Sequence, residues 1–436
     1  MKKLKLLFVL NLFMFFTLSC ERDNINLESN SINKNNTISV ERVSSTSRKN
    51  YSPNQLVIEF ASYTTDSQKN ALRSYYGVLE YKLCQHCADN AIELWFFENG
   101  IEIEPKKTTI EDPPVGGVHY PLIINVDFEY FLSTSSTISS NDLSSNLSSN
   151  YQQYIKNNND GITIAVFDTG IIPSIGGNNP VFQNQFLYNA SNDGIPGIYS
   201  GWDFVNHDND CDDDNTGMHG TIVTSIITDI LNDNQNPVPH QILPLKICDS
   251  EGKASYFNLL CAMSYALERA DILQMSLGWY DNNSGDLVDN IFSDLLNAYP
   301  NAIVVNSAGN DTNNNDLNIH CPSGYSLNNI ISIASCNEFA LQENPLYPAN
   351  ISDFSNFGLN SVDFFANGEN IYFQGNSFSG TSFAAPVVTA LIAREKKMNP
   401  NISPNQIINN LIDIGLTCQG SFNPYRKVQY NKILIP

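Results

Sequence analysis

Apolar segments of two kinds alternate along most of this chain. From residue 151 onward, short apolar runs such as GITIAVFD (161–168) are followed by longer runs such as HGTIVTSIITDIL (219–231). Short apolar runs are typical of buried strands, and apolar positions three or four apart are typical of helices. The pattern continues as strand, helix, strand, helix and strand in ILPLKIC (242–248), SYFNLLCAMSYALERA (255–270), DILQMSLG (271–278), IFSDLLNAY (291–299) and AIVVNSAGN (302–310). This alternation predicts an α/β fold, with a parallel central sheet and helices on both faces.

A smaller α+β pattern precedes this region, in residues 51–131. Strands are predicted at QLVIEF, AIELWFF and PLIINVDFEYFL, and SQKNALRSYYG predicts a short amphipathic helix that ends at Gly77. A Ser- and Asn-rich run follows, which is typical of a linker. We therefore expect a small domain at 51–131, a linker at 132–150 and a larger domain at 151–436.

The N-terminus resembles an export signal. MKKLK supplies positive charge, LLFVLNLFMFFTLS supplies an apolar stretch too short for a comfortable membrane span, and Ser19 precedes Cys20. A small residue before a cysteine at this place resembles a bacterial lipoprotein signal. We expect a signal peptide at 1–19, lipidation of Cys20 and a flexible tether at 20–50. The protein would be exported, as a membrane-anchored lipoprotein or an extracellular protein after processing. An ordinary cleaved signal with an incidental cysteine is the alternative.

Composition narrows the class of protein further. A net charge of −22, with no basic patch outside the N-terminus, excludes nucleic acid as a partner. Eight cysteines remain besides Cys20, and an even number in an exported chain permits disulfides without fixing their connectivity. Cys84 and Cys87 have the spacing of metal ligands, but no second pair follows.

Three residues with complementary chemistry are expected at one edge of the predicted sheet. Asp168 ends a strand, His219 begins a helix, and Ser382 begins another in FSGTSFAAPVVTALIA. The carboxyl ends of parallel strands carry the active site in such folds. Serine becomes a strong nucleophile when an imidazole takes its proton and a carboxylate orients that imidazole. Each residue also has an ordinary structural role, in a turn or a helix cap, so the case rests on their combination.

The flanking residues make that combination specific. Asp168-Thr-Gly, His219-Gly-Thr and Gly-Thr-Ser382-x-Ala-Ala-Pro, in this order, resemble the subtilisin-like serine peptidase (subtilase) family from about residue 151 to 436. The resemblance implies a subtilisin-like fold and a serine endopeptidase that acts on protein or peptide substrates. It also implies that residues 51–131 are a propeptide, that the chain is made as a zymogen, and that no organic cofactor is required. We expect a monomer.

The resemblance also implies roles for further residues. VVNSAGND would present Asn310 to the oxyanion, and ILQMSLG would line the substrate with Ser276, Leu277 and Gly278. His320 would lie at the floor of the primary specificity pocket, where small residues are common, so it would shrink the pocket and add a hydrogen-bond donor. A position at the rim of the pocket is the alternative for His320.

An acidic loop is a candidate calcium site. GWDFVNHDNDCDDDN (201–215) carries five Asp residues between 208 and 214. Thermitase-like subtilases bind calcium in a similar loop, and calcium favours clustered oxygen ligands. The comparable residues are Asp203, Asn206, Asp208 and Asp210. A solvated acidic loop is the alternative, and any calcium would be structural.

The sequence therefore predicts an exported, surface-anchored serine endopeptidase. Two other classes stay open. One is a catalytically silent, surface-tethered binding protein on a subtilase scaffold. The other is a thiol or zinc protein built on Cys84 and Cys87.

Overall fold

A computed structural model describes most of the chain beyond its N-terminal segment. Met1–Thr46 form a separate unit from Ser47–Pro436, and the predicted signal peptide, most of the tether and Cys20 lie outside the described residues. Within the part of the chain that the structure describes, no helix is long and apolar enough to cross a membrane. The described residues are 49–84, 91–112, 122–134, 137–139, 151–175, 179–182, 185–193, 200–281, 290–337, 351–417, 426 and 428–436.

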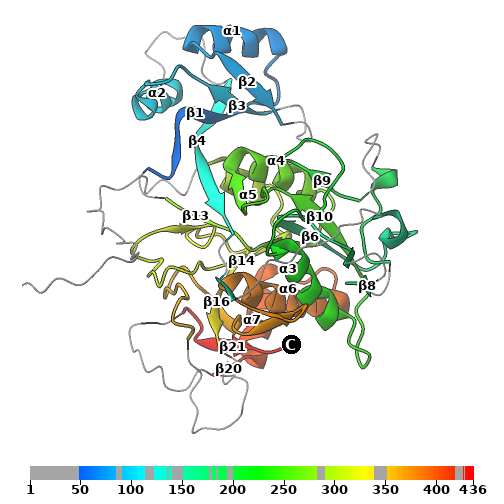
Figure 1. The fold of residues 1–436 in the computed structure, drawn as a ribbon. Coiled ribbons are helices and arrows are strands. Elements are labelled where there is room, and N and C mark those ends of the chain that lie inside the picture. Colours follow the sequence, from blue (N-terminus) through cyan, green and yellow to red (C-terminus); the bar gives the residue numbers. More distant parts are fainter. Residues whose placement is uncertain are drawn as a thin grey trace, which may run out of the picture. The chain divides into compact units, whose positions relative to one another are not determined.

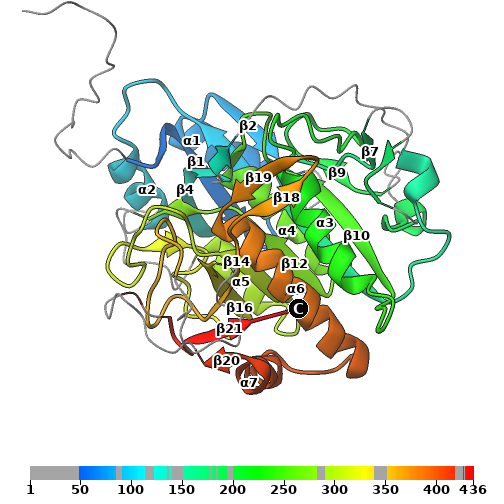
Figure 2. The same cartoon turned by 60° about the horizontal axis from the view of Figure 1, so that its bottom comes forward.

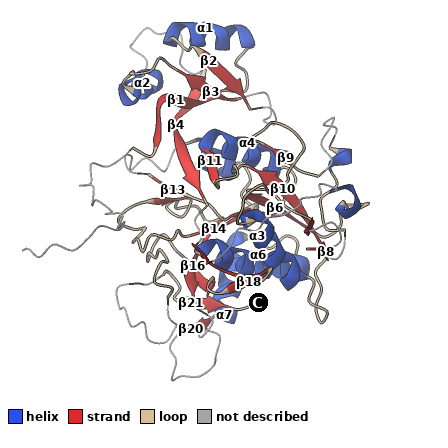
Figure 3. Ribbon diagram, viewed as in Figure 1, coloured by secondary structure: helices blue, strands red, loops and turns tan. Residues whose placement is uncertain are grey.

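The N-terminal region forms an antiparallel sheet with two helices. Its strands lie in the order β11-β4-β1-β3-β2. Strands β1 to β4 are labelled in Figure 1, and β11, which comes from much later in the chain, is labelled in Figure 3. Helix α1 begins with a capping box between Thr65 and Gln68 and ends at Gly77, whose φ of 71° suits glycine. The bounds are β1 Tyr51–Phe60, α1 Asp66–Tyr76, β2 Glu80–Leu83, β3 Ile92–Phe96, α2 Ile103–Glu111, β4 Ile123–Ser133 and β11 Lys253–Ser255.

A larger, mostly parallel sheet forms the centre of the rest of the chain. Its nine strands have the order β20-β21-β17-β16-β14-β12-β6-β10-β9, and all but the edge strand β20 run parallel. The bounds are β6 Ile162–Asp168, β9 Trp202–Asp203, β10 His240–Lys246, β12 Ile272–Met275, β14 Ile303–Ser307, β16 Ile330–Cys336, β17 Phe364–Asn367, β20 Leu416–Thr417 and β21 Lys432–Leu434.

Helices cover both faces of this sheet (Figure 3). In β6, Ile164 and Val166 pack into the core that contains α3, α6 and α7, whereas Ala165 and Phe167 pack into the core that contains α4 and α5. Successive side chains of a strand point to opposite faces, so a strand buried on both faces is continuously apolar. The predicted α/β fold is therefore confirmed. The helices are α3 His219–Leu231, α4 Tyr256–Leu267, α5 Ile291–Asn297, α6 Thr381–Met398 and α7 Pro404–Ile414.

Short elements complete the described fold. They are the 3-10 helices Tyr151–Tyr154 and Ala190–Asn192 and the strands β5 Thr137–Ser139, β7 Ser174–Ile175, β8 Asn179–Pro180, β13 Trp279–Tyr280, β15 His320–Cys321, β18 Ile371–Phe373 and β19 Asn376–Ser379.

Candidate active site

The fold brings Asp168 and His219 into direct contact. Asp168 is the last residue of β6 and His219 is the first residue of α3. His219 Nδ1 lies 2.7 Å from Asp168 Oδ1, and the same oxygen accepts a hydrogen bond of 2.8 Å from the Thr169 N–H. Both side chains are buried, at 1% and 3% exposure.

A glycine after the histidine allows this close approach. A side-chain carbon on Gly220 would lie 2.3 Å from the Gly170 carbonyl oxygen and 3.0 Å from Asp168 Cβ. The Gly220 N–H donates instead to Thr169 Oγ1, at 3.0 Å. The His-Gly pair therefore lets α3 begin against the end of β6, which positions the imidazole.

The surroundings of His219 suit a general base. A carboxylate only accepts hydrogen bonds, so His219 Nδ1 carries the proton that it shares with Asp168. Nε2 is buried and has no hydrogen-bond partner within the described residues. Burial by itself lowers the pKa of His219, but the charge and hydrogen bond of Asp168 outweigh it, so the pKa is raised. The Nε2 lone pair is left to accept a proton from a neighbouring group.

Ser382 is the second residue of α6, beside the start of α3. Helices α3 and α6 lie side by side (Figure 2), and the ring of Phe383 lies 5.4 Å from the His219 ring. The Ser276 hydroxyl donates to the Ser382 carbonyl oxygen at 2.7 Å, and Ser382 Oγ lies 3.2 Å from the Ser276 carbonyl oxygen. A helix N-terminus also carries a partial positive charge. The structure therefore places the serine hydroxyl and the imidazole at the same ends of two packed helices.

Asn310 lies on the other side of the start of α6. Its Oδ1 accepts hydrogen bonds from the Thr381 N–H at 2.8 Å and from the Thr381 hydroxyl at 2.9 Å. Because these donors fix the carbonyl side of the amide, the amide NH2 group is on the opposite side, where it can donate. Such a donor stabilises an oxyanion when it lies beside a reacting carbonyl. Thr381 was not predicted from sequence, although it stands inside the Gly-Thr-Ser motif.

The predicted substrate-lining segment follows β12. Ser276 contacts Ser382 as described, Leu277 is buried, and Gly278 begins the turn into β13. Gln274 Nε2 donates to Ser276 Oγ at 2.8 Å, and the Thr389 hydroxyl donates to Gln274 Oε1. Gln274 therefore links the lining segment to the middle of α6, a role that its sequence context did not reveal.

A segment from the N-terminal region runs along this edge. Ser133 and Gly278 exchange two backbone hydrogen bonds of 3.2 Å, and the Thr134 N–H donates to the Gly252 carbonyl oxygen at 2.9 Å. Further on, β5 pairs with β19, where Thr137 lies opposite Ser379. The described parts of the segment therefore approach Ser382 from both sides. Sequence alone did not predict this contact, because a Ser- and Thr-rich run indicates a linker.

Two buried carboxylates join the N-terminal sheet to the rest of the chain. Asp127 in β4 accepts hydrogen bonds from the Tyr256 hydroxyl at 2.9 Å and the Ile291 N–H at 3.1 Å, and Glu129 accepts from the Phe257 N–H at 3.0 Å. These N–H groups belong to the first turns of α4 and α5, so the carboxylates cap two helices. Burial raises the pKa of each carboxylate to about 7.

This contact is expected to weaken as the pH rises. An exposed carboxylate has a pKa of about 4, so docking takes up protons, and stability is lost as the pH rises from about 4 to about 7. In the full-length Ser382→Ala protein, hydrogen-exchange protection of β4, corrected for intrinsic rates, should fall from about pH 5 to about pH 8. The Asp127→Asn/Glu129→Gln variant should show no such fall. Equal pH dependence in both proteins would contradict the assignment.

The predicted calcium ligands are used differently in the structure. Asp203 Oδ1 accepts from the Val205 and Asn206 N–H groups at 2.7 and 2.9 Å, and Asp208 Oδ1 accepts from the Asp210 N–H at 2.9 Å. Within the described residues, no group of three or more His, Cys, Asp or Glu side chains is arranged to hold a metal ion. Calcium binding by this loop therefore stays a prediction.

Six of the cysteines lie within the described residues. Cys84 is disulfide-bonded, and a disulfide sulfur is not a zinc ligand, so the zinc alternative loses one of its two residues. Cys87 and Cys418 lie outside the described residues. Among the described cysteines, Cys211, Cys248, Cys261 and Cys321 are free thiols, and these four and Cys336 are buried.

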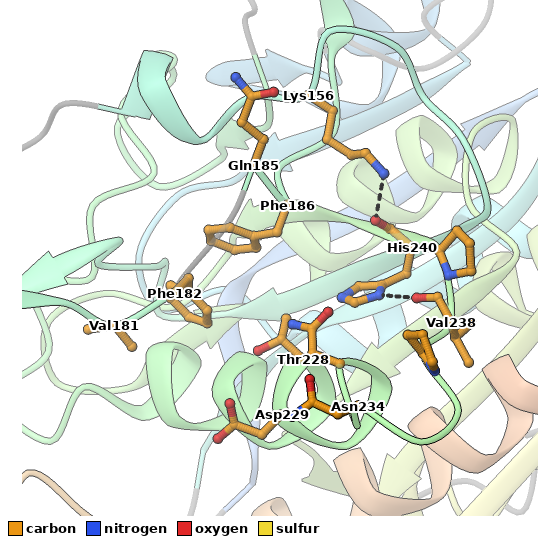
Figure 4. Close-up of a pocket in the computed structure, with 13 residues that line it drawn as sticks. Lys156, Val181, Phe182, Gln185, Phe186, Thr228, Asp229, Asn234, Val238 and His240 are labelled. Atoms are coloured by element: carbon orange, nitrogen blue, oxygen red, sulfur yellow. Dashed lines mark hydrogen bonds between the residues drawn. The ribbon is translucent and has the colours of Figure 1, made fainter.

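A separate cavity of 540 Å³ lies at the opposite end of β10 from the Asp168 end of the sheet (Figure 4). It is lined by Phe182, Phe186, Lys156 and His240 among others. Lys156 Nζ donates to the His240 carbonyl oxygen at 3.2 Å, and His240 Nδ1 lies 2.7 Å from the Val238 carbonyl oxygen. None of the predicted catalytic or substrate-lining residues lines this cavity.

Comparison with known proteins finds subtilisin-like proteases. The family model of the subtilase family matches residues 159–414. Subtilisin-like protease 2 of Plasmodium falciparum is 30% identical over 186 residues, which are 40% of this chain and 13% of that protein. Fervidolysin from Fervidobacterium pennivorans, a keratinolytic enzyme related to subtilisin, is 16% identical with a TM-score of 0.56, over 87% of this chain and 60% of its own. A cold-adapted subtilisin-like serine proteinase is 20% identical with a TM-score of 0.45, over 67% and 92%. The family match spans Asp168, His219, Asn310 and Ser382.

Proposed function

This chain belongs to the subtilase family, and we propose that it is a serine endopeptidase whose catalytic residues are Asp168, His219 and Ser382. The observation that carries the proposal is the His219 imidazole. It is hydrogen-bonded through Nδ1 to the buried Asp168 carboxylate, and within the described residues its Nε2 has no hydrogen-bond partner. The imidazole lies beside the start of α6, which carries Ser382. This arrangement can take a proton from a serine hydroxyl.

The proposed reaction has two stages. His219 Nε2 accepts the Ser382 proton as Ser382 Oγ attacks the peptide carbonyl, and Asp168 stabilises the imidazolium that forms. The Asn310 amide and the Ser382 N–H donate to the oxyanion. The imidazolium then gives its proton to the leaving amine. Water hydrolyses the acyl-enzyme by the same proton transfers in reverse.

A fluorophosphonate probe tests this proposal directly. Such probes phosphonylate an activated serine, so labelling should occur at Ser382, together with hydrolysis of peptide substrates. Absence of both labelling and hydrolysis in the processed protein would favour the alternative function, a catalytically silent binding protein on the same scaffold.

Asn310→Ala should lower kcat while leaving KM nearly unchanged. The Asn310 amide would donate mainly to the oxyanion, which exists only in the transition state and the tetrahedral intermediates. Losing one such donor costs about 10² to 10³ in kcat. Steady-state kinetics on a peptide substrate measure this loss, with Asn318→Ala, an exposed asparagine nearby in the chain, as the control. An unchanged kcat would remove Asn310 from the mechanism.

We propose further that the enzyme is made as an exported zymogen. Support comes from the segment Ser133–Thr134 and strand β5, which pair with Gly278, Gly252 and β19 on either side of Ser382. A segment held there blocks the approach of another peptide. Cleavage between Thr134 and Thr137 would separate residues 51–131 from the catalytic domain.

The N-terminal signal gives this cleavage a second consequence. If Cys20 carries lipid, the anchor lies on the N-terminal side of the cut and the catalytic domain lies on the other side. Maturation would then release the peptidase from the membrane once the N-terminal fragment dissociates. Detergent partitioning of full-length and processed protein tests the anchor, since a Cys20→Ser chain should leave the detergent phase.

A further inference from the structure

An imidazole ring fills the gap between the ends of two neighbouring strands. Strand β12 leads into Gly278, and strand β14 leads into Gly309. A side-chain carbon built on Gly278 would lie 2.3 Å from His320 Cε1, and one built on Gly309 would lie 3.1 Å from His320 Nε2. The ring therefore lies directly against both backbones. His320 is only 5% exposed.

Several contacts hold this ring in place. Strand β15 pairs with β13, so that His320 lies opposite Tyr280, and the two rings meet edge to face with centroids 5.1 Å apart. His320 Nδ1 lies 3.3 Å from the Ser323 hydroxyl. Burial lowers the pKa of His320 to about 4 despite the opposing charge of Asp311, so the ring is neutral at pH 7. It offers a peptide a wall without charge.

This wall lies where the residue before the cleaved bond must go. Ser276 contacts Ser382, and Asn310 contacts Thr381. A carbonyl that lies between Ser382 and Asn310 therefore has the segments 276–278 and 308–310 on either side of its side chain. The gap between these segments is the space that the His320 ring occupies.

The described residues that pair with this edge on either side of Ser135 and Ser136, namely Thr134 and Thr137, are small. Phe131 and Leu132 are large, but from Ser133 to Thr137 the sequence is Ser-Thr-Ser-Ser-Thr. Ser133 and Thr134 pair with Gly278 and Gly252, and Thr137 pairs with Ser379. Ser135 and Ser136 lie outside the described residues. The change from large to small residues occurs as the segment approaches Ser382.

We propose that His320 is a specificity-determining residue that restricts the residue before the cleaved bond to a small, uncharged side chain, such as glycine, alanine or serine. The proposal rests on the proposed serine endopeptidase function. Its substrates are accordingly proteins with Gly, Ala or Ser at this position of an extended segment, and the run 133–137 of the chain itself offers such residues.

A substrate series on the processed enzyme tests the proposal. Peptides that differ only in having Ala, Ser, Leu or Phe before the cleaved bond are compared by kcat/KM. Wild type should prefer Ala and Ser, and His320→Gly should raise the Leu-to-Ala and Phe-to-Ala ratios by about 10- to 200-fold. His320→Ala, a milder change, should raise the ratios in the same direction if the glycine variant fails to fold. His240→Ala removes a buried histidine at the far end of the sheet and should leave both ratios unchanged.

The possible outcomes separate this inference from the proposed function. Efficient cleavage after Leu or Phe by wild type overturns the inference while supporting the peptidase, as do unchanged ratios in folded His320 variants. Absence of both peptide hydrolysis and fluorophosphonate labelling of Ser382 overturns the proposed function, and the inference with it.

Discussion

Replacing Ser382 by alanine is expected to abolish peptide hydrolysis and fluorophosphonate labelling. The hydroxyl is the only group in the proposed mechanism that bonds covalently to substrate. Once it is gone, the His219 imidazole has no proton to accept. Losing the nucleophile of such a triad costs about 10⁶ in kcat. The residual rate would come from binding and oxyanion stabilisation, as attack by water.

The same variant tests processing of the chain. If the enzyme cuts its own linker, Ser382→Ala should accumulate as full-length protein, whereas wild type yields a fragment that begins between Thr134 and Thr137. Mass spectrometry of the purified proteins locates the new N-terminus. Ser377→Ala, which removes a hydroxyl from strand β19 five residues earlier, serves as the control and should be processed normally. Equal processing of the Ser382→Ala chain would show that another protease makes the cut.

Sequence could predict the catalytic elements because their signals are local. Asp168 and His219 each stand at the boundary of a clear apolar segment, where the element type and its end are both evident. The parallel sheet then brings the carboxyl ends of its strands to one edge. The helix predicted over the run HGTIVTSIITDIL is confirmed as α3, His219–Leu231.

Other parts of the fold left no comparable local signal. Helix α2 was not predicted, because its cap residue Glu102 makes no side-chain capping hydrogen bond and Pro105 and two threonines interrupt its short run. Strand β11 has three residues and pairs with β4 from far earlier in the chain. Such short strands form through backbone hydrogen bonds with distant partners, which side-chain patterns do not encode.

The position of the segment around Ser133 shows the same limit at the site itself. Its Ser- and Thr-rich composition indicates a flexible linker, yet its backbone pairs with Gly278 and Gly252. Small residues lack the apolar side chains that would mark a buried strand. The property that makes the segment look like a linker also suits it to a narrow cleft. The position of the His320 ring is equally non-local, since the ring lies against two glycines that follow separate strands.

Asp168→Ala is expected to lower kcat by about 10⁴, with KM nearly unchanged. The Asp168 carboxylate fixes His219 Nδ1 as the protonated nitrogen and stabilises the imidazolium during reaction. Without it, the ring can turn or adopt the other tautomer, and the positive charge forms in a buried site with less compensation. The groups that contact substrate are not changed, so the loss should fall on kcat.

The pH profile separates this electrostatic role from a general structural one. In wild type, the raised pKa of His219 means that kcat/KM falls as the pH drops through a value above about 6.5, the ordinary histidine pKa. Removing Asp168 takes away a charge and a hydrogen bond that raise this pKa, and it leaves burial, which lowers the pKa, opposed by the smaller effect of the Asp213 charge. The acid limb of the residual activity should therefore move to lower pH.

Asp213→Asn is the matched control, since Asp213 is buried nearby but bonds to Thr169 and Thr221 instead of His219. The Asp213→Asn variant should lower kcat by less than about tenfold, because the Asp168–His219 hydrogen bond persists. Equal losses in the two variants, or an acid limb that does not move, would show that Asp168 acts through folding alone.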